Sequence, residues 1–122
     1  MHPCVKKFNH QVEFYIHEGC YITEISNSDN DPGLSIARAR VEPGVTTKLH
    51  QLLDTIERYV ILEGQGLVEV EGISPQKVGL CDVVIIPPES TQKITNTGSS
   101  ELIFLAICSP RFRKSIYQEI AS

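Results

Sequence analysis

The chain has 122 residues, of which 41% are hydrophobic and 21% are charged, and its formal net charge is -4 at pH 7. No stretch approaches the roughly 20 consecutive apolar residues of a transmembrane helix, and the acidic balance argues against binding to the phosphate backbone of nucleic acid. We therefore predict one globular domain over residues 1–122, with no membrane or nucleic-acid partner.

An alternation of apolar and polar residues with a period of two predicts strands along almost the whole chain. The expected strands are rich in Val, Ile, Thr and aromatic residues and lie at 12–17, 20–26, 34–42, 58–63, 67–72, 82–87, 92–97 and 101–108. Turn segments such as "NSDNDPG" (27–33) and "NTGSS" (96–100) separate them. Short strands at this spacing predict an all-β sandwich or barrel rather than alternating strands and helices.

The end of the chain departs from this pattern. In "RKSIYQEIA", the apolar residues Ile116, Tyr117 and Ile120 recur at helical spacing. We predict a short C-terminal helix over residues 113–121 that caps the barrel.

The cysteines and the N-terminus indicate the cellular compartment. Cys4, Cys20, Cys81 and Cys108 are scattered without a C-x-x-C pair, so they fit neither a zinc knuckle nor a thioredoxin-type centre. The stretch "MHPCVKKFNHQVEF" lacks the continuous apolar region of a secretory signal. These features predict a cytoplasmic protein with reduced cysteines.

Two segments carry spaced motifs. The first is expected to fold as strand–turn–strand around its His and Glu, and it consists of Gly44, five residues, His50, any residue, Leu52, four residues, Glu57, six residues and Gly64. The second consists of Cys81, five residues, Pro87, Pro88, Glu89, two residues, Gln92, three residues and Asn96. Tight turns are expected at Gly44 and Gly64, because glycine adopts positive φ without steric cost.

These segments resemble the two motifs of the cupins, which are small β-barrels of the jelly-roll type. The cupin patterns run Gly, five residues, His-x-His, three or four residues, Glu, six residues, Gly, and then Gly, five residues, Pro-x-Gly, two residues, His, three residues, Asn. The resemblance covers roughly residues 34–110 and implies an all-β double-stranded β-helix. Because Glu89 stands at a glycine position, its turn is expected to differ in backbone from the family's turn.

The resemblance also implies where a metal would bind. Cupins hold a divalent transition metal with three His and one Glu, and here those positions carry His50, Leu52, Glu57 and Gln92. Leu52 has no donor atom, and Gln92 offers only a neutral carbonyl oxygen. The metal site is therefore degenerate: Zn, Mn, Fe or Ni, if bound, is held weakly by His50, Glu57 and Gln92, unless Tyr59 or water completes the shell.

The period of two places Glu57, Tyr59 and Ile61 on one strand face and Gln92, Ile94 and Asn96 on another. In the cupins the glutamate's face lines the barrel interior, and such a lining is typical of a pocket that is mostly apolar with a few polar groups. The predicted ligand-binding residues are His50, Leu52, Glu57, Tyr59, Ile61, Gln92, Ile94 and Asn96.

The candidate catalytic residues are His50, Glu57 and Tyr59. A buried Glu57 would have a shifted pKa and could form a general acid/base pair with His50, while Tyr59 or Gln92 orients the substrate. The alternative is a satisfied buried hydrogen bond without catalysis.

Three function classes follow. The first is a binding protein for a small polar metabolite, sugar-like or carboxylate-bearing, with a degraded metal site. The second is a metal-dependent dioxygenase or isomerase, and the third is a metal-free acid/base isomerase, epimerase or lyase. Whether the protein is an enzyme stays open at this point.

Three further features are surface predictions. Arg38 and Arg40 are expected to point outward, because the alanines between them would then face the interior and keep it open. The resemblance implies that Arg111 or Phe112 guards the barrel mouth, and the alternative is that they belong to a plain surface turn. The resemblance implies a homodimer formed through residues 12–26.

Overall fold

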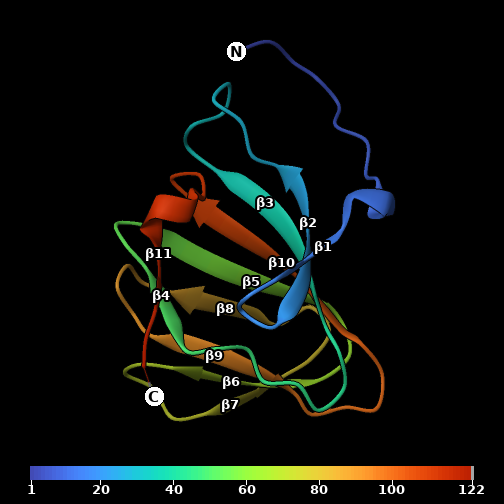
Figure 1. Cartoon of the computed structure of the whole chain (residues 1–122), viewed down its shortest axis with the longest axis vertical. Coiled ribbons are helices and arrows are strands. Elements are labelled where there is room, and N and C mark those ends of the chain that lie inside the picture. The colour runs from blue at the N-terminus through green and yellow to red at the C-terminus, as the bar shows by residue number, and fades with distance from the viewer. Residues whose placement is uncertain (122) are drawn as a thin grey trace.

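The structure is a computed structural model that describes residues 1–121, and nearly all of its regular structure is strand (Figure 1). The strands are β1 (Phe14–Ile16), β2 (Cys20–Ser26), β3 (Ser35–Val41), β4 (His50–Leu52), β5 (Ile56–Glu63), β6 (Gly66–Val70), β7 (Gln76–Val78), β8 (Val83–Ile86), β9 (Gln92–Asn96), β10 (Leu102–Ser109) and β11 (Tyr117–Glu119). The described residues also form two single 3-10 turns, η1 (His10–Val12) and η2 (Lys114–Ile116). The all-β prediction is confirmed.

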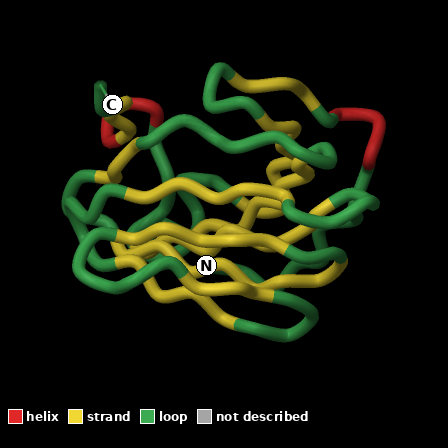
Figure 2. The backbone as a smooth tube through the Cα atoms, turned by 90° about the horizontal axis from the view of Figure 1, so that it is seen from below, coloured by secondary structure: helices red, strands yellow, loops and turns green. Residues whose placement is uncertain are grey.

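The strands form two antiparallel sheets. One has the order β1-β2-β3-β10-β5-β8 and the other the order β11-β4-β9-β6-β7. From β3 onward the chain crosses repeatedly between the sheets, so that strands distant in sequence become neighbours, as in the pairing of β10 with both β3 and β5. Figure 2 shows the strands running across the molecule with loops at both ends. This winding is that of a double-stranded β-helix.

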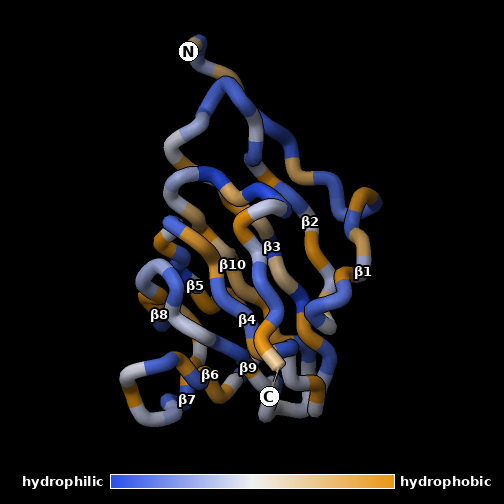
Figure 3. The backbone as a smooth tube through the Cα atoms, turned by 60° about the vertical axis from the view of Figure 1, so that its left-hand side comes forward, coloured by the Kyte–Doolittle hydropathy of each residue, from blue (hydrophilic) through white to orange (hydrophobic). Residues whose placement is uncertain are grey.

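The space between the sheets is filled by alternate residues of the strands. Figure 3 shows hydrophobic and hydrophilic residues alternating along the tube. Glu57, Tyr59 and Ile61 of β5 and the even-numbered residues of β9 are buried, as the period of two predicts. The core cluster consists of Cys20, Ala39, Val41, Tyr59, Ile61, Val68, Val70, Val84, Ile86, Ile94, Leu102 and Phe104.

The predicted C-terminal helix is wrong. Residues 114–116 form only a 3-10 turn, and β11 then pairs antiparallel with β4, as the red segment beside β4 in Figure 1 shows. The Leu53 amide donates to the Ile116 carbonyl at 2.9 Å, and the Ile120 amide donates to the Leu49 carbonyl at 2.9 Å. A segment this short is a marginal helix, and the open edge of β4 offers its backbone hydrogen-bond partners instead.

The turn glycines adopt the expected conformation. Gly44 has a φ of 79° and Gly64 a φ of 84°. In the second motif the residues at glycine positions are also left-handed: Cys81 has a φ of 69° and Glu89 a φ of 60°. Contrary to the expectation for Glu89, its turn therefore has the backbone conformation that glycine favours.

The arginines of β3 lie on the outer side of their sheet, as expected, while Ala39 between them is buried in the core. Arg40 donates to both carboxylate oxygens of Glu13, at 3.0 and 2.6 Å, and its guanidinium lies 4.1 Å from the ring centroid of Tyr21. These contacts fix the N-terminal segment against the sheet and leave Arg40 outside the barrel interior.

The side chain and the backbone of Arg111 contact the loop between β2 and β3. Its guanidinium donates to the side chains of Asn27 at 2.9 Å and Asp29 at 2.5 Å, and its amide donates to the Pro32 carbonyl at 3.1 Å. Arg111 therefore anchors the connection between β2 and β3.

Among residues 1–121, no helix has the length and apolar character needed to cross a membrane.

Candidate functional site

A chain of hydrogen bonds crosses the barrel interior between the two sheets. The Tyr59 hydroxyl, on β5, donates to Gln92 Oε1 on β9 at 2.5 Å, and Gln92 Nε2 donates back to Glu57 Oε1 on β5 at 2.7 Å. The Cys108 thiol donates to Glu57 Oε2 at 3.8 Å. Gln92 is fully buried, and Glu57 is only 7% exposed. The structure thus brings three of the predicted polar residues into one buried cluster.

His50 completes this cluster from β4. It lies opposite Gln92 in the β4–β9 register and is 2% exposed. Its Nδ1 lies 2.8 Å from the Lys48 carbonyl, which can only accept, so Nδ1 carries a proton. Its ring stacks on Tyr117 with a centroid distance of 5.2 Å. Because Nδ1 is engaged by the backbone, Nε2 is the ring nitrogen that remains for a contact with another side chain.

Nε2 faces a residue that the sequence did not predict, Glu18. This residue lies in the turn between β1 and β2, and its Oε1 is 3.5 Å from His50 Nε2. The Cys20 thiol donates to Glu18 Oε2 at 3.8 Å. No periodic pattern or motif marks a glutamate in a turn 32 residues before its histidine. The only local signal is the adjacent Gly19, whose φ of 105° makes the turn tight.

The two carboxyl groups are desolvated. Burial raises the pKa of Glu18 to about 7, and hydrogen bonding to Cys20 opposes this shift. Burial and then the charge of Glu18 raise the pKa of Glu57 to about 7, against the opposing effects of His50 and Gln92. The arginine and lysine ion pairs of the described residues involve Glu13, Glu69, Glu101 and Asp29, so neither buried carboxyl group is neutralised by a permanent cation.

The other predicted ligand-binding residues are apolar neighbours of the cluster, except for Asn96, which lies away from it. Leu52, Ile61 and Ile94 are buried, on the same strand faces as His50, Glu57 and Gln92 respectively. Asn96 lies at the other end of β9, and its Nδ2 donates to the carbonyls of Val41 at 2.9 Å and Ser100 at 2.8 Å. Because its Oδ1 also accepts the Gly98 amide at 2.9 Å, the side chain of Asn96 is engaged in holding a turn.

The donor set does not fit the transition-metal centre that the cupin resemblance implies. Leu52 occupies one ligand position, and the carbonyl oxygen of Gln92 already accepts the Tyr59 hydroxyl. Within residues 1–121, no group of three or more His, Cys, Asp or Glu side chains is arranged to hold a metal ion. Three or four converging donors are the usual requirement for such a centre.

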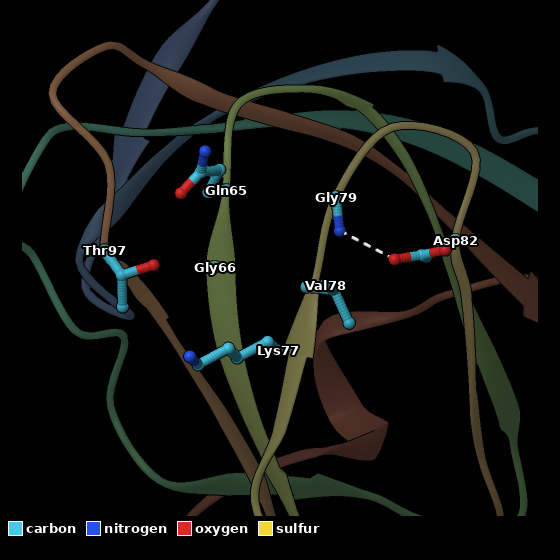
Figure 4. Close-up of a pocket in the computed structure, with 7 residues that line it drawn as sticks. All are labelled: Gln65, Gly66, Lys77, Val78, Gly79, Asp82 and Thr97. Carbon is cyan, nitrogen blue, oxygen red and sulfur yellow. Dashed lines mark hydrogen bonds between the residues drawn. The ribbon is translucent and has the colours of Figure 1, made fainter.

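Two surface depressions lie away from the cluster. One, of about 540 Å³, is lined by Gln65, Gly66, Lys77, Val78, Gly79, Asp82 and Thr97 (Figure 4). The other, of about 300 Å³, lies between β11 and the segment 46–49. Neither includes Glu57, Tyr59 or Gln92, whose side chains are buried in the described structure.

No family model matches the chain. The Uncharacterized protein MJ1618 of Methanocaldococcus jannaschii is 33% identical over 97 residues, which cover 78% of this chain and 77% of that protein. An Oxalate-binding protein of Thermotoga maritima is 36% identical over 72 residues, which cover 58% of each chain.

Solved structures agree on the fold. A conserved protein with a double-stranded β-helix domain from Klebsiella pneumoniae has a TM-score of 0.77 at 11% identity, covering 96% of this chain and 98% of that one. The cupin domain of Cnp3 from Schizosaccharomyces pombe has a TM-score of 0.67 at 15% identity, covering 80% and 69%. The chain therefore has the cupin fold and belongs to the same family as MJ1618 of Methanocaldococcus jannaschii.

Proposed function

We propose that the protein binds a small polar metabolite, sugar-like or carboxylate-bearing, at the cluster of His50, Glu57, Tyr59 and Gln92. The observation that carries this proposal is the hydrogen-bonded chain from Tyr59 through Gln92 to Glu57, which places polar groups between two sheets where apolar side chains would be more stable. Ligand-binding sites are typically mostly apolar and carry a small number of convergent polar groups of this kind. The name of the Oxalate-binding protein relative supports a small-molecule ligand.

We further propose that this binding does not use the cupin metal site. Gln92 is committed to Tyr59 and Glu57, and Leu52 cannot coordinate, so two of the four ligand positions lack an available donor. Protein purified without chelators is expected to lack stoichiometric Zn, Mn, Fe or Ni in elemental analysis. A stoichiometric metal would contradict this part of the proposal and favour the metal-dependent dioxygenase or isomerase.

The binding itself is tested by thermal unfolding with a panel of monosaccharides, sugar acids and short dicarboxylates including oxalate. A ligand at 100 times its Kd stabilises the folded state by about 2.7 kcal/mol, which is a measurable rise in Tm. We expect Glu57→Gln to reduce this rise in Tm. Glu24 is exposed, and the control variant Glu24→Gln is expected to leave the rise unchanged. If no compound of the panel raises the Tm of the wild-type protein, the proposal is wrong.

One observation favours a second candidate, the metal-free acid/base isomerase, epimerase or lyase. Glu18 and Glu57 each have a pKa raised to about 7, and His50 lies 3.5 Å from Glu18. A group with a pKa near neutrality exchanges protons most effectively at that pH. In an enzyme, Glu57→Gln would retain binding of the compound identified above but abolish its turnover, whereas a binding protein shows no turnover in either form.

We also propose a homodimer through residues 12–26. β1 is an edge strand of the six-stranded sheet, and its Phe14 and Tyr15 are 46% and 61% exposed. Light scattering is expected to give twice the mass of one chain, and Phe14→Lys is expected to give one chain. Ile85→Lys, at the opposite sheet edge, is the control that leaves the mass unchanged. A monomeric wild type would contradict this proposal.

The cytoplasmic location stays a prediction.

A further inference from the structure

The hydroxyl group of Tyr117 is buried and has no hydrogen-bond partner among residues 1–121. Tyr117 begins β11, and its ring lies on the ring of His50 at a centroid distance of 5.2 Å and an interplanar angle of 22°. Buried hydroxyl groups in folded proteins almost always have a partner, because leaving one unpaired is costly. A polar group from outside the chain is therefore expected to meet the Tyr117 hydroxyl.

The surroundings of this hydroxyl restrict what that group can be. The carboxyl group of Glu18 lies at the same histidine: its Oε1 is 3.5 Å from His50 Nε2, and the Tyr117 ring is stacked on the His50 ring. After burial, the charge of Glu18 is the largest cause that raises the pKa of Tyr117. Tyr117 can donate a hydrogen bond, whereas an ionised carboxylate can only accept one. Above pH 7, where Glu18 with its pKa of about 7 is mostly ionised, a group placed between them must accept from Tyr117 and donate to Glu18.

A hydroxyl group does both, and a carboxylate does not. An anion such as oxalate would only accept hydrogen bonds. Above pH 7 it would also be repelled by ionised Glu18 and Glu57, which have no arginine or lysine partner in the described structure. A neutral polyol avoids both penalties because its hydroxyl groups carry no charge. Of the two ligand classes named above, the sugar-like class fits this end of the site.

We propose that Tyr117 is a ligand-contacting residue that donates a hydrogen bond to a hydroxyl group of a neutral sugar or related polyol, and that Glu18 accepts a hydrogen bond from the same group. This inference rests on the proposed binding function and narrows it to one ligand class. It also assigns two residues that lie outside both cupin motifs of this chain, on the turn before β2 and on β11.

The position of Tyr117 also explains how a ligand reaches a cluster that is closed in this structure. β11 pairs only with β4, through three residues, and Gln118 and Glu119 are exposed. β4 itself is joined to β9 by the single pair His50 and Gln92. Displacement of β11 would break these pairs and the two flanking bonds, from the Leu53 amide to Ile116 and from the Ile120 amide to Leu49, and would open the cluster to solvent. The Tyr117 hydroxyl meets the ligand when β11 has returned to β4.

The variant Tyr117→Phe tests the proposal because it removes only the hydroxyl group and keeps the stacked ring. Without ligand, we expect the Tm of this variant to rise by about 3–6 °C, since an unpaired buried hydroxyl disappears. In titrations followed by thermal shift, we expect the neutral monosaccharides and alditols that stabilise the wild-type protein to bind the variant about 3- to 10-fold more weakly. The control is Ser115→Ala, which removes the hydroxyl of an exposed residue outside the proposed dimer segment and should matter in neither measurement.

Each other outcome overturns a defined part of the proposal. An unchanged or lower Tm of the ligand-free variant means that the hydroxyl is already paired, for example with a permanent water. A higher Tm with unchanged polyol affinity means that Tyr117 does not touch the ligand. Stabilisation of the wild type by oxalate or another dicarboxylate, but by no neutral polyol, rejects the ligand class and leaves small-molecule binding intact. No stabilisation by any compound rejects the binding function as well.

Discussion

Between pH 4.5 and pH 7, the free energy of unfolding is expected to fall as the pH rises. The pKa of Glu57 is about 4.5 in an unstructured chain and is raised to about 7 in the fold, mainly by burial. In this pH window the unfolded state has lost the proton and the folded state retains it, so raising the pH favours unfolding. The shift corresponds to on the order of 3 kcal/mol of stability that is present below pH 4.5 and lost by pH 7. Glu18, with a pKa also raised to about 7, acts in the same direction.

Urea denaturation across this pH range in wild type, Glu57→Gln and Glu24→Gln measures the effect. Glu57→Gln keeps the shape of the side chain and the acceptor for Gln92 but cannot ionise, so its stability is expected to vary less with pH and to exceed that of the wild type at pH 8. Glu24 is exposed, and its replacement is expected to leave the slope unchanged. A wild-type stability that is constant or rises from pH 4.5 to pH 7 would contradict the placement of desolvated carboxyl groups in the barrel.

Gly64→Ala is expected to destabilise the protein by about 3–5 kcal/mol. Gly64 ends the first motif at the turn between β5 and β6, with a φ of 84°. A Cβ atom at this position would lie 2.5 Å from the Glu101 carbonyl oxygen and 3.0 Å from the Leu102 Cα, both of which are backbone atoms. The backbone of the loop before β10 would have to move, and the pairing of β10 with β5 would move with it.

The glycine at position 72 provides the matched control. Gly72 has a φ of 96°, but a Cβ atom there would meet nothing within 4 Å. Gly72→Ala therefore measures the conformational cost alone, about 1–2 kcal/mol. Chemical denaturation of both variants should show Gly64→Ala to be the less stable by about 2 kcal/mol or more. Equal losses would mean that β10 does not approach the turn as closely as the structure has it.

Much of the fold was determined by local sequence features. The period of two along β5 and β9 sets which side chains point inward, because alternate residues of a strand face opposite sides. The glycine spacing of the first motif located Gly44 and Gly64 at turns with positive φ. For this reason the all-β architecture could be predicted without coordinates, whereas the double-stranded β-helix and the common burial of Glu57, Tyr59 and Gln92 were implied by the resemblance to the cupins.

The end of the chain shows where local patterns fail. The spacing of Ile116, Tyr117 and Ile120 predicts a helix, yet the backbone there pairs with β4. The choice between the two depends on an open sheet edge more than 60 residues earlier in the chain. A strand of three residues carries too little periodic signal to be recognised by itself.

The sequence by itself determined the strands, the turns and the half of the candidate site that lies within the two motifs. Only the tertiary structure decided that Glu18 faces His50, that Gln92 is bonded on both sides and that Tyr117 covers the cluster. The physical reason is that strand periodicity acts between neighbours in the chain, whereas these contacts join a turn, a motif strand and a C-terminal strand that meet only when the two sheets close.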